Sequence, residues 1–124
     1  MSVIIRDDGF HDDDYSGSGV LDIAQDLLPH ALPRQFDGID LIRVAFPSSA
    51  DGRGFSLARH LRALGYKGRL RAKGHVIADQ YTMARRCGFD EIEITDDLAR
   101  RQPADQWAFR ADWRDHDYRA RLKG

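Results

Sequence analysis

Apolar residues recur in two patterns along this chain, short continuous runs and runs with helical spacing. The strongest continuous run covers residues 39–46 (Ile-Asp-Leu-Ile-Arg-Val-Ala-Phe), as in buried parallel strands. Residues 55–64 follow with helical spacing, which places Leu57, Leu61 and Leu64 on one face. We therefore predict a buried strand and then an amphipathic helix.

The same alternation continues toward the C-terminus. We predict further strands over residues 3–5, 69–73 and 91–94, and further helices over residues 20–28, 76–87, 96–101 and 104–109. Strands and helices that alternate with short connections are typical of parallel sheets. The sequence thus predicts an α/β fold with a small, mainly parallel sheet of consecutive strand–helix units. A barrel-like fragment is the alternative shape.

Charged residues alternate with apolar ones inside the predicted strands. The strand over residues 39–46 contains Arg43. The strand over residues 69–73 contains Arg69, Arg71 and Lys73, and the strand over residues 91–94 contains Glu91 and Glu93. If these positions share one side, that side of the sheet is lined with charge, which a helical layer could not cover without a large desolvation cost. We expect an open sheet closed by self-association, so a homo-oligomer.

Length and charge distribution set the domain division. A chain of 124 residues suits one domain, and residues 7–19 are rich in Asp, Gly and Ser, as exposed loops are. We expect an exposed acidic segment over residues 1–19, a single α/β domain over residues 20–111 and a charged tail over residues 112–124.

The charges are unevenly distributed. Residues 1–40 carry two Arg against nine Asp, residues 41–86 carry ten Lys or Arg against two Asp, and residues 87–124 carry seven basic against nine acidic residues. The net charge of −1 argues against nucleic-acid and membrane partners. The basic middle indicates either internal ion pairs or a local anion site.

Cysteine and histidine usage narrows the class of protein. Cys87 is the only cysteine, so no intramolecular disulfide forms, which favours a reducing cytoplasm. The N-terminus has too few apolar residues for a signal peptide or a membrane span. The histidines show no metal-ligand spacing, and we predict no metal site.

The loop before the second predicted helix is the candidate anion site. Ligands of parallel α/β sheets bind beyond the carboxyl ends of the strands, where the glycines of this loop can expose N–H groups at a helix N-terminus. The predicted anion-binding residues are Asp51, Gly52, Arg53, Gly54, Arg59 and Arg71. The alternative is a purely local role, in which Asp51 caps the helix and Arg53 pairs with an acid.

His75 and Asp79 are the candidates for a general acid or base. They lie close together in a helical projection, and both follow the strand predicted over residues 69–73. The alternative is that His75 is a structural or solvent-exposed side chain. The glycine spacing matches neither a Walker loop nor a dinucleotide fingerprint, and the sequence identifies no cofactor.

A family resemblance adds a biological setting. The residues that carry it are Phe46-Pro47, Asp51-Gly52-Arg53-Gly54-Phe55-Ser56, Ala58-Arg59, Leu61-Arg62, Gly65-Tyr66-Lys67-Gly68, Leu70-Arg71-Ala72, Gly74, Val76, Asp79-Gln80 and Arg86-Cys87-Gly88-Phe89-Asp90. This segment resembles an uncharacterised bacterial family often labelled "probable oxidoreductase", whose genes commonly lie beside those for assimilatory sulfite reductase. The residues themselves contain no flavin or nicotinamide fingerprint, redox cysteine pair or haem motif.

The resemblance implies a small cytoplasmic accessory protein of sulfite reduction. Such a protein would bind the reductase, an electron donor or a sulfur oxyanion. Two alternatives from other functional classes stay open: a homo-oligomeric interaction scaffold, and a small enzyme that acts on an anionic substrate.

Overall fold

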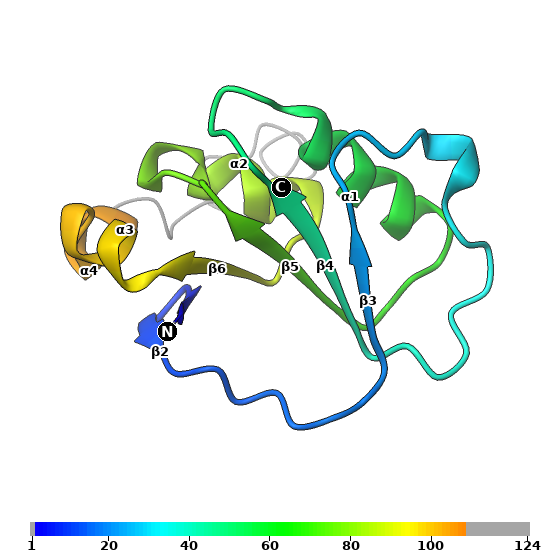
Figure 1. Ribbon diagram of the computed structural model, residues 1–124, viewed down its shortest axis with the longest axis horizontal. Helices are drawn as coiled ribbons and strands as arrows, with labels where there is room; N and C mark the ends of the chain where they lie inside the picture. The colour runs from blue at the N-terminus through cyan, green and yellow to red at the C-terminus, as the bar shows by residue number, and fades with distance from the viewer. Residues whose placement is uncertain (1, 109–124) are drawn as a thin grey trace, which may run out of the picture.

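The computed structural model describes residues 2–108, which form a six-stranded sheet flanked by short helices (Figure 1). The strands are β1 (Ser2–Arg6), β2 (Gly9–His11), β3 (Val20–Ile23), β4 (Leu41–Phe46), β5 (Arg69–Gly74) and β6 (Glu91–Thr95). The helices are α1 (Arg53–Ala63), α2 (Tyr81–Cys87), α3 (Asp96–Arg101) and α4 (Ala104–Ala108), with single 3-10 turns η1 (Pro29–Ala31) and η2 (Ala78–Gln80).

The sheet is open and mainly parallel. Its order is β2-β1-β6-β5-β4-β3, and β3 to β6 run parallel, whereas β1 is antiparallel to both of its neighbours. The α/β prediction is confirmed. The barrel-like alternative is wrong for the described residues, because β2 and β3 end the sheet as separate edges.

One sequence prediction near the N-terminus is wrong. Residues 20–28 were expected to form a helix, but Val20–Ile23 is the edge strand β3, which pairs with β4. Pairing with a distant strand decided the conformation here, which local spacing does not reveal. The strand predicted over residues 3–5 is present as β1, and Ile4 and Ile5, within the segment 1–19 that was expected to be exposed, are fully buried.

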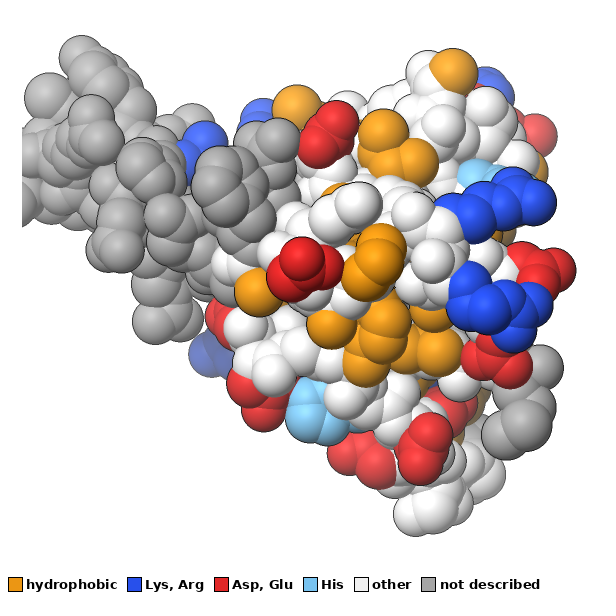
Figure 2. All heavy atoms as spheres, turned by 90° about the vertical axis from the view of Figure 1, so that its left-hand side faces the viewer, with side chains coloured by type: hydrophobic (Ala, Val, Ile, Leu, Met, Phe, Trp, Pro, Cys, Tyr) orange, Lys and Arg blue, Asp and Glu red, His pale blue; other side chains and the backbone are white. Residues whose placement is uncertain are grey.

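The helices α3 and α4 lie at one end of the sheet, near β6, β1 and β2 (Figure 1). The surface of this end carries a central gathering of apolar side chains between acidic and basic ones (Figure 2). None of the described helices combines the length and apolar character that crossing a bilayer requires. The predicted tail over residues 112–124 lies outside the described residues.

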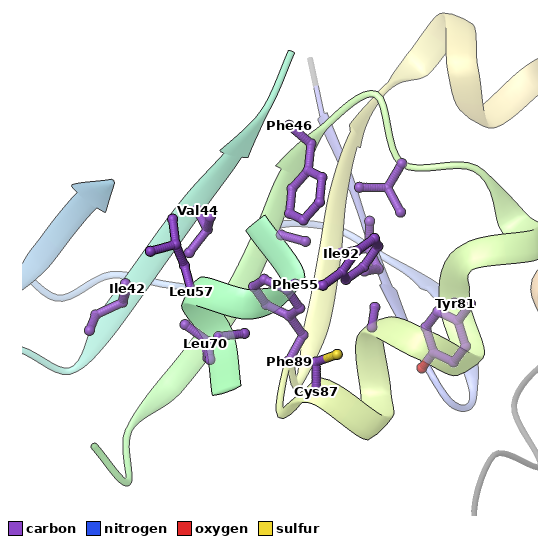
Figure 3. Packing of buried hydrophobic residues seen from close by; sticks show 14 of the residues in the cluster. Ile42, Val44, Phe46, Phe55, Leu57, Leu70, Tyr81, Cys87, Phe89 and Ile92 are labelled. Carbon is purple, nitrogen blue, oxygen red and sulfur yellow. The ribbon is translucent and has the colours of Figure 1, made fainter. Parts of the chain in front are cut away.

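One face of the sheet carries the apolar core. Side chains of β4, β5 and β6 pack there against α1 and α2 (Figure 3). The Phe46 ring lies 5.0 Å from Phe55 and 5.8 Å from Phe89, centre to centre. A Cβ on Gly54 would lie 2.5 Å from the Phe46 ring, so the glycine lets α1 approach β4 closely.

The opposite face carries the predicted row of charge. Arg43, Arg71 and Glu91 stand side by side on β4, β5 and β6. Arg71 is fully buried, with Nε 2.6 Å from Glu91 and Nη1 2.7 Å from Glu93. The expectation of a charge-lined side is therefore confirmed, and each buried charge there has an opposite partner, as burial requires.

The acidic segment before β3 covers this charged face. Asp13 lies 3.2 Å from Arg71, while Asp14 lies 2.7 Å from Arg6 and 3.0 Å from Arg69. The face that was expected to need self-association is thus covered from within the chain. The basic residues of the middle and the acids of the N-terminal region meet here as internal ion pairs.

Candidate functional site

A cavity of about 430 Å³ opens at the carboxyl ends of the three parallel strands β3, β4 and β5. This is the edge at which open parallel sheets bind ligands. Its lining comprises Asp22, Ile23 and Ala24 from β3 and its end, Arg43, Ala45, Phe46 and Pro47 from β4 and its end, and Lys73, Gly74 and His75 from β5 and its end. The cavity lies on the charged side of the sheet and extends past its edge.

The turn after β5 carries His75 to this cavity. Gly74 has a φ of +131°, and a Cβ on it would lie 2.4 Å from the Phe46 carbonyl oxygen. The backbone N–H of His75 donates to that same oxygen at 2.7 Å. A residue with a side chain would be strained at position 74, so the glycine permits the close approach that fixes His75 beside the end of β4.

One ion pair forms part of the wall. Arg43 donates to Asp22 through Nε at 2.6 Å and through Nη2 at 2.9 Å. The guanidinium holds the pKa of the Asp22 carboxyl below its usual value, and desolvation opposes this effect. Two-point pairing of this kind orients both groups and nearly cancels their charges.

Lys73 supplies charge that is less completely balanced. Its ammonium lies 3.8 Å from Glu93, and its side chain is 46% exposed. Glu93 already accepts a hydrogen bond from Arg71 at 2.7 Å. A long, solvated pair of this kind contributes little. The formal charges on the lining are therefore two cations against one carboxylate, with His75 as a further basic group.

His75 is the one predicted acid–base residue that lines the cavity. Its side chain is exposed and makes no hydrogen bond or ion pair with residues 2–108. Asp79 lies in η2 and is not part of the cavity wall. Its neighbour Gln80 links the connection after β5 to the connection after β4, because the Gln80 side chain donates to the Ser49 carbonyl at 2.7 Å. The structure thus places His75 at the cavity and Asp79 beyond its wall.

In the loop that was predicted to bind an anion, the charge of Arg53 is neutralised by Asp51. Arg53 donates to Asp51 from its backbone N–H and from Nε, each at 3.0 Å, and from Nη2 at 2.6 Å. The Arg53 guanidinium holds the pKa of the Asp51 carboxyl far below its usual value. This geometry matches the part of the local alternative in which Arg53 pairs with an acid, whereas the N-cap of α1 is Gly52 and has no side-chain cap. Arg53 instead borders a smaller hollow of about 150 Å³ beside Gln25 and Asp26.

The remaining residues that were predicted to bind an anion lie in different parts of the structure. Gly52 is exposed before α1, and Gly54 packs on Phe46 in the core. Arg59 donates to the Cys87 sulfur at 3.3 Å, on the far side of α1 from the strand ends. Arg71 lies on the face opposite α1, where its carboxylate partners raise its pKa although burial opposes this effect. The six residues therefore do not form one site.

The cavity residues that the sequence reasoning missed carried a partial signal. Arg43 and Lys73 were assigned to the charged face, and the carboxyl ends of the strands were named as the binding edge. Together these two observations already point to Lys73 from the sequence. Asp22 could not be found, because residues 20–28 were expected to be helical.

Residues 2–108 hold no gathering of three or more His, Cys, Asp or Glu side chains that could bind a metal ion. Among the residues that line the cavity, the basic side chains Arg43, Lys73 and His75 outnumber the one carboxylate, Asp22.

Comparison with known proteins places the chain in a family. The sequence model of DUF934, described as a bacterial protein of unknown function, matches residues 20–121. No curated protein and no solved structure matches the chain. The matched region contains every residue of the cavity wall, whereas β1 and β2 precede it. The chain therefore belongs to the DUF934 family of bacterial proteins of unknown function.

Proposed function

We propose that this protein is a cytoplasmic accessory protein of assimilatory sulfite reduction that binds a small sulfur oxyanion. The observation that carries the proposal is the cavity at the ends of β3, β4 and β5, whose wall has an excess of basic groups. Lys73 and His75 are the groups that meet the anion. The family resemblance of the segment from Phe46 to Phe89 supports the sulfite-reduction setting.

A thermal-shift series tests the binding step. Sulfite, sulfate and phosphate are added in turn, because a ligand that binds only the folded chain raises the unfolding midpoint. We expect sulfite to raise the midpoint of the wild type and to lose this effect in Lys73→Met. Lys67→Met is the matched control, since Lys67 is exposed and precedes β5 at its opposite end.

A second comparison separates the cavity from the loop predicted by sequence. Arg53→Ala removes a guanidinium that is already paired with Asp51 outside the cavity wall. The sulfite response should survive this change. A response that disappears in Arg53→Ala and persists in Lys73→Met would return the site to residues 51–54.

The reductase partnership needs a separate experiment. The tagged protein is used to capture partners from its own host, and the eluate is scored for sulfite reductase. Recovery of the reductase at the same yield from an unrelated tagged control would refute the partnership.

A homo-oligomeric scaffold is the second candidate function. The end of the molecule that carries α3 and α4 displays gathered apolar side chains (Figure 2), and among the large apolar residues Met83 is 52% and Leu28 59% exposed. Contiguous apolar surface of this kind marks contact sites. Light scattering of the full chain tests this candidate, and a strict monomer at high concentration removes it.

A further inference from the structure

The cavity is larger than an inorganic oxyanion requires. Its volume of about 430 Å³ lies within the range of roughly 300–1,000 Å³ found for sites of small organic ligands. Sulfite has one sulfur and three oxygens, so it occupies the space of only a few water molecules of about 30 Å³ each. Most of the cavity would remain outside the reach of such an ion.

The walls of the cavity also differ in chemistry. The end of β5 contributes Lys73 and His75, which are basic. The ends of β3 and β4 contribute the apolar residues Ala24, Ala45 and Pro47, while Ile23 and Phe46 border the cavity from positions whose side chains belong to the apolar core. The Asp22–Arg43 pair between them is internally balanced. A ligand that matches both walls carries one negative group and a compact apolar body.

We infer that the cavity binds a small organic anion, whose carboxylate or sulfonate group meets Lys73 and His75 while its apolar body lies against the ends of β3 and β4. This inference rests on the proposed anion-binding function and names the class of ligand. The apolar body adds affinity that a bare oxyanion lacks, because it removes apolar surface from water on both sides. The negative group selects against neutral molecules of the same shape.

Four probe ligands separate the contribution of the negative group to affinity from that of the apolar body. Calorimetric titrations of the full chain use benzenesulfonate, benzoate, neutral benzamide and inorganic sulfite. We expect at least one aromatic anion to bind about tenfold or more tightly than both benzamide and sulfite. The tighter of the two aromatic anions identifies the head group as sulfonate or carboxylate.

Three variants assign the binding to this cavity. Ala45→Ile places additional methyl groups in the cavity from an exposed strand position that suits a β-branched residue. It should weaken the aromatic anion about tenfold or more and leave sulfite unchanged. Lys73→Met should weaken both the aromatic anion and sulfite, whereas Lys67→Met should change neither. Unfolding curves of each variant confirm that it is folded.

The outcomes distinguish this inference from the function on which it rests. Sulfite binding that depends on Lys73, without tighter binding of either aromatic anion, overturns the inference and leaves the proposed function intact. Aromatic-anion binding that Ala45→Ile abolishes, without any sulfite response, supports the inference and overturns the sulfur-oxyanion function. Benzamide that binds as tightly as the anions overturns the inference, and no binding of any probe overturns both.

Discussion

Gly74 packs against the backbone of the core residue Phe46 and also lines the cavity. Its positive φ turns the chain immediately after the last pair of β5, and the lack of a side chain lets it lie against the Phe46 carbonyl. Phe46 is buried in the apolar core and also borders the cavity. The position of His75 therefore depends on backbone packing, since its side chain makes no hydrogen bond or ion pair with residues 2–108.

The cost of a side chain at this position can be measured against a matched glycine. Gly74→Ala introduces both a strained φ and an overlap with the Phe46 carbonyl. Gly9 has a similar φ of +122°, but a Cβ added there would meet no atom within 4 Å, so Gly9→Ala introduces the strain alone. We expect Gly74→Ala to lower the free energy of unfolding by about 1–3 kcal/mol more than Gly9→Ala does. Urea denaturation of both variants measures the difference, and equal losses would show that overlap at Gly74 is unimportant.

At the scale of elements, Arg62 links the ends of two helices. Its guanidinium donates to the carbonyls of Tyr66 and Gly68, which follow α1, and to the carbonyl of Gly88, which ends α2. It also pairs with Asp90 at 2.9 Å. Tyr66 and Gly68 lie in the connection after α1, and Gly88 caps α2, so one side chain satisfies several backbone acceptors and sets the two connections against each other.

Removing this link should destabilise the fold. Arg62→Ala leaves three carbonyls without their donor, and we expect a loss of about 2 kcal/mol in the free energy of unfolding. Arg59→Ala is the matched control on the same helix, because within residues 2–108 the Arg59 side chain donates only to the Cys87 sulfur. We expect that control to cost less than about 1 kcal/mol. Chemical denaturation of the two variants gives the comparison, and a smaller loss for Arg62→Ala would contradict the linking role.

The acidic segment before β3 makes the charged face sensitive to acid. A hydrogen bond from Arg71 lowers the pKa of Asp13, and one from Arg6 lowers that of Asp14 from 3.8 to about 2. Because these pKa values are lower in the folded chain, the unfolded chain takes up the protons first as the pH falls. The stabilisation that both carboxylates provide near neutrality is therefore lost as the pH falls from about 4 to about 2.

This loss predicts a difference between variants. Below pH 4 the unfolding midpoint of the wild type should fall more steeply than that of the double variant Asp13→Asn/Asp14→Asn. Asp12→Asn is the control, since Asp12 makes no ion pair with the described residues, and it should follow the wild type. Thermal unfolding followed by circular dichroism between pH 7 and pH 2 checks this, and parallel curves for the wild type and the double variant would contradict it.

At the scale of the whole molecule, the two sheet faces are covered by opposite means. Helices α1 and α2 bury the apolar face, whereas charged side chains and the acidic segment close the other. Strand β1 contributes to both, because Ile5 joins the apolar core while Ile4 stands beside Glu93 on the charged side. Residues ahead of the family match are thus part of the folded unit.

This role of β1 predicts that the first strand is needed for stability. Ile5→Ala should lower the free energy of unfolding by about 2–5 kcal/mol, because Ile5 is fully buried in the core. Leu28→Ala is the control, since Leu28 is 59% exposed, and it should change stability by less than about 0.5 kcal/mol. Guanidinium denaturation of both variants tests the expectation, and similar small changes would mean that residues 1–19 fold independently of the sheet.

The predictions from sequence succeeded where the signal was local. Gly65 and Gly88 directly follow the helices predicted over residues 55–64 and 76–87, and both have the positive φ of helix-ending glycines, at +101° and +112°. Alternation along β5 and β6 led to the expectation of one charged side of the sheet, and in the structure Arg71 pairs with Glu91 on that side. The glycine-rich loop was different, because its glycine and arginine signals also fit internal packing. The structure uses Gly54 for contact with Phe46 and Arg53 for pairing with Asp51.

The sequence by itself determined the α/β class, the central strands and helices, and the charged side of the sheet, because periodicity and helix-ending glycines act over a few residues. Tertiary structure alone decided that Val20–Ile23 is a strand, that Asp13 and Asp14 cover Arg71 and its neighbours, and that Lys73 and His75 share a cavity with the ends of β3 and β4. Each of these outcomes depends on partners distant in the chain. Their energies come from strand pairing, ion pairing and close packing, which no local pattern of residues specifies.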